Sequence, residues 1–292
     1  MFSAYSIKIA LKNPFPSKNI SMSQDTSQDH ISRKLVLFQL PDQDKVTIRQ
    51  DLVFHTVGDD VLTLDLYVPA DAKSGELLPA VLIVTGYPDV GFQKLVGCKF
   101  KEMGSSISWG KLIAASGMIA ITYTNREPVA DVHTLLRFVR QSADELGIDA
   151  SRVGLWASSG NVPLALALLM EPDFQDVQCA AFCYGYTLDL NAATHVADVS
   201  RMFGFANPGQ GKSTADLPQT TPLFFARAGQ DQCPHLNDTL DRFLVDALRC
   251  NLPVSLINHP EAPHAFDLLH DSPETREIIQ HILRFLHVHL LK

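Results

Sequence analysis

The chain has 292 residues, of which 46% are apolar and only 19% are charged. This length and composition are enough to bury a large core in a single domain. The net charge is −8, and the first 24 residues contain three lysines and no acid, so the acidity lies entirely in the remainder. Such an acidic body argues against nucleic acid or an anionic membrane as the main partner.

The cysteines are five in number and have no paired C-x-x-C spacing. This pattern favours neither a disulfide framework nor a structural zinc site, and we expect reduced thiols in a cytoplasmic protein. No segment approaches the roughly 20 consecutive apolar residues that span a bilayer. The apolar patch at residues 7–11 is interrupted by Lys8, which fits a secretory signal poorly.

Residues 1–35 are predicted to form a flexible extension, and residues 36–292 one α/β domain. The first 24 residues contain serine and lysine but no arginine. Three interpretations remain open: a transit-like segment, an upstream-extended start with Met22 as the functional initiator, and a tail without function. We find no internal repeat and no linker to a second domain.

Along the chain, short apolar runs alternate with longer amphipathic segments. A hairpin is expected first, because two β-branched runs flank a Gly/Asp turn at residues 57–60. The predicted strands lie at 45–55, 61–68, 79–85, 118–123, 153–157, 179–184, 222–228 and 253–258. The predicted helices lie at 106–116, 129–146, 160–170, 236–249 and 273–290, with a further one at 196–203.

This alternation predicts a mostly parallel sheet of the eight-stranded type, with helices on both faces and an antiparallel hairpin at its start. Residues 187–221 are polar, contain Gly and Pro, and are long enough to form a lid or a pocket insertion. The glycines at 86, 91 and 97 match neither G-x-G-x-x-G nor a P-loop, so nucleotide chemistry is disfavoured.

The segment at residues 152–161 carries the strongest chemical signal. An apolar strand ends at Ser159 and a helical pattern follows, as in a nucleophile elbow, where a tight turn exposes a serine hydroxyl. The usual pattern has glycine two residues before and after the serine, and Ala157 and Asn161 stand at those places here. Ser158 is a second candidate, but it would put the bulky Trp156 at a small-residue position.

A serine nucleophile needs a histidine base and an acid that orients it, and in doubly wound hydrolases they follow in the order Ser, Asp/Glu, His. Asp231 follows the strand predicted at 222–228, and His264 lies in the loop after the strand predicted at 253–258. We therefore predict a triad of Ser159, Asp231 and His264 at the carboxyl edge of the sheet.

Other groups compete for these roles. Asp231 also fits a turn acid or a helix cap, and Asp238 and Asp241 are nearby carboxylates that look like solvated helix positions. His259 and His270 compete with His264, but neither is followed by Ala-Phe-Asp as His264 is.

Acyl transfer also needs N–H donors for the developing oxyanion. We expect one from Gly160, the residue after the nucleophile, and the second from the loop that follows the strand at 79–85. Tyr87 is the first choice for the second donor and Gly86 the alternative, since Pro88 has no N–H. The alternative interpretation is an ordinary strand-ending turn in which Tyr87 only packs.

The chain resembles the α/β-hydrolases of the serine esterase and dienelactone-hydrolase-like type. The likeness lies in the segments Leu-Asp-Leu-Tyr-Val-Pro at 64–69, Val-Gly-Leu-Trp-Ala-Ser-Ser-Gly at 153–160, Ala-Gly-Gln-Asp at 228–231 and Pro-His-Ala-Phe at 263–266. It covers roughly residues 45–290. The His-Gly-Gly-Gly motif of hormone-sensitive-lipase-like esterases is replaced by Thr-Gly-Tyr-Pro at 85–88, which separates the chain from that subfamily.

The resemblance implies a serine hydrolase of carboxylic esters that needs no metal and no organic cofactor, acting on a small-molecule ester. A short acyl group is preferred to a long lipid chain, because the 187–221 insertion is modest and not conspicuously apolar. A lactonase, thioesterase or peptidase would use the same residues, and a non-catalytic ligand-binding member of the fold is the alternative from another class. Whether the protein is a monomer or a homodimer stays open.

The remaining polar residues have simpler interpretations. The C-terminal histidines lack metal-site spacing, so we expect them at the surface or half-buried. Cys98 and Cys233 are expected to be core or loop thiols. The polar side chains after residue 88 are expected in a solvated loop, with a pocket entrance as the alternative. These are the histidines His281, His287 and His289 and the loop residues Asp89, Lys94, Lys99 and Lys101.

Overall fold

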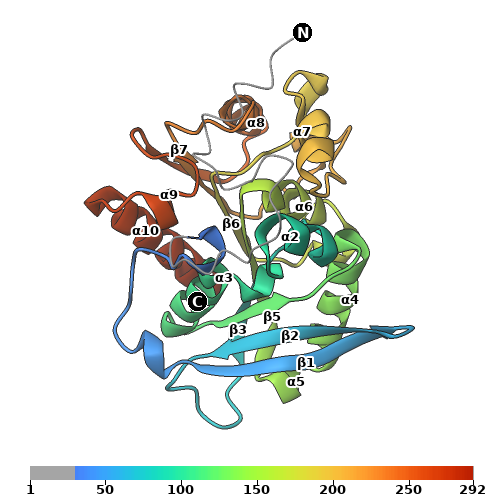
Figure 1. Cartoon of the computed structure of the whole chain (residues 1–292), viewed down its shortest axis with the longest axis vertical. Coiled ribbons are helices and arrows are strands. Elements are labelled where there is room, and N and C mark those ends of the chain that lie inside the picture. Colours follow the sequence, from blue (N-terminus) through green and yellow to red (C-terminus); the bar gives the residue numbers. More distant parts are fainter. Residues whose placement is uncertain (1–29, 292) are drawn as a thin grey trace.

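The fold is built on one eight-stranded sheet, seen in a computed structural model that describes residues 30–291. The strand order is β1-β2-β4-β3-β5-β6-β7-β8 (Figure 1). β2 runs antiparallel to both of its neighbours, and β4, β3, β5, β6, β7 and β8 run parallel to one another. The prediction of a mostly parallel sheet opened by a hairpin is therefore confirmed.

The strands are β1 (Thr47–Val57), β2 (Asp60–Val68), β3 (Leu78–Ile83), β4 (Ile119–Tyr123), β5 (Ile148–Ser158), β6 (Cys179–Cys183), β7 (Leu223–Ala228) and β8 (Val254–His259). The α-helices are α2 (Asp89–Val96), α3 (Gly104–Ala115), α4 (Pro128–Gln141), α5 (Ala143–Leu146), α6 (Val162–Leu168), α7 (Val196–Phe203), α8 (Leu236–Arg249), α9 (Phe266–Leu269) and α10 (Pro273–Leu290). Short 3₁₀ helices are η1 (Ile31–Arg33), η2 (Gln43–Lys45), η3 (Phe100–Glu102), η4 (Ser159–Asn161), η5 (Pro172–Phe174), η6 (Leu190–Ala192) and η7 (Thr214–Asp216).

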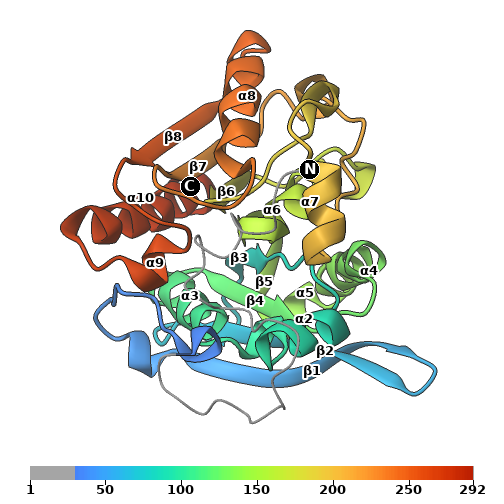
Figure 2. The same cartoon turned by 45° about the horizontal axis from the view of Figure 1, so that its top comes forward.

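Helices cover both faces of the sheet, as the alternating pattern predicts. On one face, α4, α6 and α8 pack apolar side chains such as Leu135, Leu166 and Phe243 against the strands. On the other face, α3 and α10 contribute Leu112 and Ile282, among others, to a second core. Figure 2 shows the same layers with the top of the molecule turned forward. A sheet buried on both faces holds its strand ends rigidly, which suits the placement of catalytic groups.

Two of the predicted helices differ in form from the observed ones. The helix predicted at 129–146 is two helices, because the chain turns at Ser142 between α4 and α5. The helix predicted at 160–170 begins as η4 and becomes α-helical only at Val162, since Pro163 lies in the first turn of α6. The helix predicted at 196–203 is present as α7.

The solvated loop predicted after residue 88 is wrong, because this segment folds into α2 and η3. Lys101 is only 6% exposed, and its ammonium lies 2.7 Å from Asp65 on β2 and 2.6 Å from Asp51 on β1. These two carboxylates compensate the buried charge and fasten η3 to the hairpin. Asp89 is buried too, and burial raises the pKa of its carboxyl to about 6.

Residues 30–40 lie against the domain on the α3 side. Gly104 at the start of α3 approaches the carbonyls of Arg33 and Lys34 so closely that a Cβ would lie 2.7 and 2.8 Å from their oxygens. Val36 is buried in the same core as α3, and the N–H of Leu37 donates to the carbonyl of Asp267 at 2.8 Å. The predictions for residues 1–29, including the Met22 start, lie outside the described residues.

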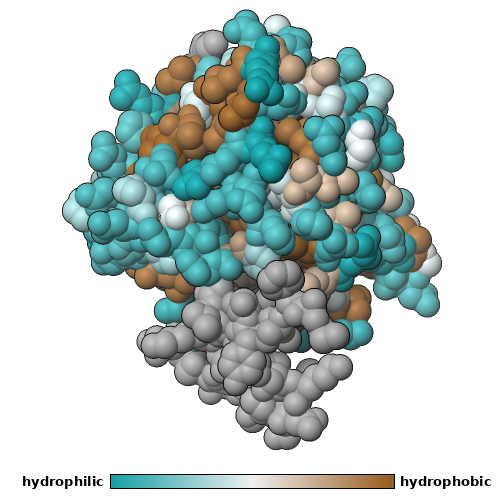
Figure 3. Space-filling model, turned by 90° about the horizontal axis from the view of Figure 1, so that it is seen from above, coloured by the Kyte–Doolittle hydropathy of each residue, from teal (hydrophilic) through white to brown (hydrophobic). Residues whose placement is uncertain are grey.

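Most of the described surface seen from above is hydrophilic, with smaller apolar areas between (Figure 3). Exposed apolar side chains include Val245 and Leu248 on α8 and Leu256 on β8. No helix between residues 30 and 291 combines the length and the apolar composition needed to cross a bilayer.

Candidate active site

Four loops meet at the carboxyl edge of the parallel strands. They follow β3, β5, β7 and β8, and they carry Tyr87, Ser159, Asp231 and His264 respectively. Open α/β sheets bind their ligands at this edge, because the loops that leave neighbouring parallel strands converge there. The site is therefore assembled from residues as far apart as 87 and 264.

Ser159 stands at the sharp turn between β5 and η4. Its φ is 55°, in the left-handed region that residues with a side chain seldom adopt. This backbone turns the chain so that Ser159 Oγ lies 2.8 Å from His264 Nε2. Ser158 has ordinary extended angles at the end of β5. The histidine thus contacts Ser159, the preferred one of the two candidate serines.

His264 links the serine to a buried acid. Its Nδ1 lies 2.7 Å from Asp231 Oδ2, and the side chains of His264 and Asp231 are 18% and 0% exposed. Burial alone would lower the pKa of His264, but the charge of Asp231 outweighs it and holds the pKa well above its usual range. The negative charge of Asp231 therefore stabilises the protonated form of His264.

The loops that carry the acid and the base are joined to each other. Gly229 N donates to the carbonyl of His259 at 2.8 Å, and Gln230 N donates to that of Ala262 at 2.8 Å. A Cβ on Gly229 would lie 2.5 Å from the carbonyl oxygen of Pro260, so only glycine allows this approach. The pairing fixes the distance between Asp231 and His264.

Two backbone N–H groups are candidate oxyanion donors. Gly160 is the second residue of η4, and N–H groups in the first turn of a helix have no intrahelical acceptor. Within residues 30–291, the N–H of Tyr87 donates to no protein acceptor, whereas that of Gly86 donates to Asn161 Oδ1 at 2.7 Å. Tyr87 is therefore the available donor, and Gly86 is already engaged.

Asparagines hold the loop that carries Tyr87. Besides the bond from Gly86 to Asn161, Asn125 Nδ2 donates to the carbonyl of Tyr87 at 3.1 Å, and the N–H of Asn125 donates to Asp89 Oδ2 at 3.0 Å. The phenol ring of Tyr87 covers the elbow, since a Cβ on Gly160 would lie 2.2 Å from its hydroxyl oxygen. These bonds hold the candidate oxyanion donor in a fixed position.

The competing residues lie elsewhere. His259 is buried beside the start of α10, 3.3 Å from the hydroxyls of Ser272 and Thr275, and His270 stacks near it. Asp238 and Asp241 are exposed on α8, as expected. The C-terminal histidines are exposed or half-buried on α10, also as expected.

Behind His264 lies a buried carboxylate, Asp267. Its oxygens accept from the Tyr184 hydroxyl at 2.7 Å and from Trp109 Nε1 at 2.8 Å, and burial raises its pKa. The ring of Tyr184 packs edge-on against His264, with centroids 5.1 Å apart. In the sequence Asp267 stands out only as a neighbour of His264, because its partners Tyr184 and Trp109 are 83 and 158 residues away in the chain.

An apolar cavity of about 270 Å³ opens beside Ser159 and His264. Its walls come from α2, α3, β5 and the loops that surround them. They include the large side chains Phe92, Phe100, Met103, Trp109, Trp156 and Tyr184. The 187–221 insertion closes part of this site, because Phe205 stacks on Tyr186 and meets Tyr87 edge-on.

Cys233 is a loop thiol, as expected, and it also lines this cavity. Its N–H donates to Asp231 Oδ1 at 2.8 Å, which turns the chain back toward the site. The signal in the sequence was its place two residues after the predicted acid. Cys98 does not line the cavity, and burial raises the pKa of its thiol to about 11.

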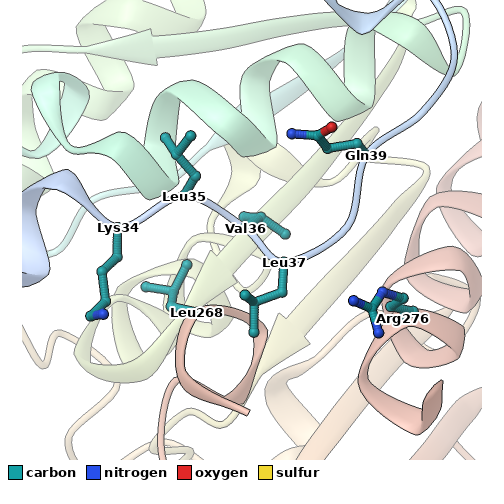
Figure 4. A pocket seen from close by; sticks show the side chains of 7 residues that line it. All are labelled: Lys34, Leu35, Val36, Leu37, Gln39, Leu268 and Arg276. Carbon is teal, nitrogen blue, oxygen red and sulfur yellow. The ribbon is translucent and has the colours of Figure 1, made fainter. Parts of the chain in front are cut away.

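A second cavity lies under the segment at residues 34–39 and reaches Leu268 and Arg276 (Figure 4). Its volume is about 550 Å³, and Lys34 and Arg276 are the charged side chains that line it. It contains none of the predicted catalytic residues, so size alone does not mark the candidate site.

The sequence matches no protein-family model, and no curated protein matches it. Solved structures do resemble it. An esterase from Rhizomucor miehei has a TM-score of 0.70 at 14% identity, over 99% of this chain and 96% of that one. Esterase 2 of the planctomycete Thermogutta terrifontis, with propionate bound, has a TM-score of 0.58 at 19% identity, over 86% of this chain and 95% of that one. The same enzyme phosphoramylated by tabun gives 0.58 at 18% identity, over 86% and 96%.

These similarities and the strand order define the class. The chain has the α/β-hydrolase fold, as the resemblance of its motifs implied. At identities below 20%, these similarities show the fold but not the activity, which depends on the residues of the site.

Proposed function

We propose that the protein is a serine hydrolase that cleaves carboxylic esters through an acyl-enzyme intermediate. The observation that carries the proposal is the continuous chain of contacts Ser159–His264–Asp231, at 2.8 and 2.7 Å, beside a cavity. Ligand binding alone does not require a serine in a strained backbone conformation, hydrogen-bonded to an imidazole that a buried acid orients. The arrangement therefore favours catalysis over binding alone.

In the first step His264 Nε2 takes the proton of Ser159 while Oγ attacks the carbonyl carbon of the ester. Asp231 holds Nδ1–H and stabilises the imidazolium. The negative charge that develops on the carbonyl oxygen is stabilised by the N–H groups of Gly160 and Tyr87, each worth about 3 kcal/mol. His264 then protonates the leaving alcohol, and the acyl group stays on Ser159.

In the second step a water takes the place of the alcohol. His264 accepts a proton from the water, and the resulting hydroxide attacks the acyl carbon through the same oxyanion geometry. The acid leaves and Ser159 regains its proton. Every proton is carried by His264, so the reaction requires neither a metal nor an organic cofactor.

A short acyl group suits this site. The cavity of about 270 Å³ lies at the small end of ligand pockets, and Phe203 of the insertion lines it. The structural neighbour with propionate bound supports the same size class.

The test is replacement of Ser159 by alanine. Hydrolysis of p-nitrophenyl acetate and butyrate should fall about 10⁴-fold or more, because a triad works as a unit and its loss removes the nucleophile. Ser158→Ala is the matched control and should retain most of its turnover. Equal turnover in wild type and Ser159→Ala would show that another group is the nucleophile.

A fluorophosphonate probe gives an independent readout. It should label the wild type and fail on both Ser159→Ala and His264→Ala, since an unactivated serine does not attack phosphorus. Labelling that survives in His264→Ala contradicts the role of that base.

A further inference from the structure

Asp231, Cys233 and His264 form a cluster that combines three different ligand types. The carboxylate oxygen, the thiol sulfur and the imidazole nitrogen that these residues offer all lie within 4.8 Å of one another. Within residues 30–291, no other three acidic, cysteine or histidine side chains gather this closely. Sulfur, nitrogen and oxygen ligands together suit a borderline-soft ion such as Zn²⁺.

The distances are close to those of a tetrahedral site. Zinc bonds of about 2.3 Å to sulfur and about 2.0 Å to nitrogen and oxygen place the ligand atoms about 3.3 to 3.6 Å apart. Since none of the separations exceeds 4.8 Å, the ligand atoms must approach by at most about 1 Å, and the Asp231–His264 contact of 2.7 Å must widen to about 3.3 Å if both of its atoms bind. The three groups leave the fourth position of the tetrahedron for water.

The backbone already holds the cluster together. Cys233 N donates to Asp231 Oδ1, and the paired loops fix Asp231 against His264. Cys233 and His264 both line the cavity, so an ion reaches them by the route that a substrate takes. The cluster is thus accessible as well as prearranged.

We propose that Asp231, Cys233 and His264 bind Zn²⁺ and that the bound ion switches off the hydrolase. Binding forms the Zn–S, Zn–N and Zn–O bonds, and the thiol proton leaves to solvent. If the ion binds His264 Nδ1, the ring proton moves to Nε2. Nε2 can then no longer accept the proton of Ser159. If the ion takes Nε2, it displaces Ser159 directly.

The binding is independent of the reaction, whereas the inhibition rests on the proposed function. The site is therefore tested with two readouts, on a chain without added histidines. Co²⁺ titration followed by absorption reports a thiolate ligand through its charge-transfer band. Zn²⁺ titration, with a fluorescent chelator as competitor and ester turnover as a second signal, reports affinity and inhibition.

The variants are Cys233→Ser, which keeps the size of the side chain, and Cys98→Ser as the control for a partly buried thiol outside the cavity. Wild type, Cys98→Ser and Ser159→Ala should bind one ion with the thiolate band. Cys233→Ser should lose the band and bind Zn²⁺ at least tenfold more weakly. Turnover of the wild type should fall with occupancy and return on adding a chelator.

A thiolate band or Zn²⁺ affinity in Cys233→Ser equal to that of wild type overturns the site. Full turnover at saturating Zn²⁺ overturns the inhibition. If the metal-free wild type hydrolyses no ester, the proposed function fails, while the Co²⁺ and chelator measurements still decide the binding. Circular dichroism of each variant shows that it is folded.

Discussion

At the scale of single residues, Asn161 shows how an unusual elbow works. This position commonly holds glycine in such turns, yet here the side-chain oxygen accepts the N–H of Gly86 at 2.7 Å. That bond joins the nucleophile turn to the loop that carries Tyr87. A polar side chain in the elbow therefore fixes the distance between the two proposed oxyanion donors.

Restoring the usual residue should consequently impair the enzyme. Asn161→Gly leaves the buried N–H of Gly86 without its acceptor and frees the loop, which costs about 1 to 3 kcal/mol. We expect kcat for p-nitrophenyl acetate to fall about 10- to 100-fold, with little change in KM. Ala157→Gly, the other change toward the usual pattern, removes no hydrogen bond and should lose far less. An increase in kcat for Asn161→Gly would contradict this role.

At the scale of elements, the 187–221 insertion is part of the site wall. Ala206 N donates to the carbonyl of Gly86 at 2.8 Å, and the ring of Phe205 lies 5.5 Å from Tyr186 and 5.9 Å from Tyr87. The insertion is thus bound to the oxyanion loop by both a hydrogen bond and aromatic packing. It acts as a support for that loop as well as a boundary of the cavity.

Phe205→Ala should therefore affect stability and selectivity together. Loss of a buried ring costs about 3 kcal/mol or more, and the space it leaves adjoins the cavity. We expect a lower melting temperature and a shift of kcat/KM toward longer acyl esters. Met202→Ala, at an exposed position on α7, is the matched control and should change neither. Equal melting temperatures of the two variants would exclude the supporting role.

At the scale of the whole molecule, Asp89 couples stability to pH. Burial raises its pKa from 3.8 to about 6, so the folded protein holds this proton more tightly than the unfolded chain. The protonated Asp89 carboxyl contributes its full share to the free energy of unfolding below pH 3.8. This contribution is lost as the pH rises through about 6. A shift of about 2 units corresponds to about 3 kcal/mol.

Asp89→Asn should remove this decline while keeping an acceptor for the N–H of Asn125. The difference in unfolding free energy between variant and wild type should grow in favour of the variant from pH 4 to pH 7, by up to about 3 kcal/mol. Urea unfolding at several pH values measures it. Asp71→Asn, at an exposed position in no ion pair of the described residues, is the control and should give a flat difference. A flat difference for Asp89→Asn as well would mean that Asp89 ionises freely.

The sequence by itself determined the fold class, and it predicted the order Ser, Asp, His of the proposed triad. Alternating buried strands and amphipathic helices are local patterns, and the small residues around Ser159 mark a strand-to-helix turn within a few positions. The acid and the base could be predicted because each follows a strand, and parallel strands present the same end at one edge.

The tertiary structure decided which groups touch. Lys101 is buried because Asp65 and Asp51 meet it from 36 and 50 residues away, and Asn161 finds its donor at Gly86 across 75 residues. Cys233 faces His264 because the two loops are joined at Gly229. Such contacts depend on how distant segments pack, and no local period or composition encodes them.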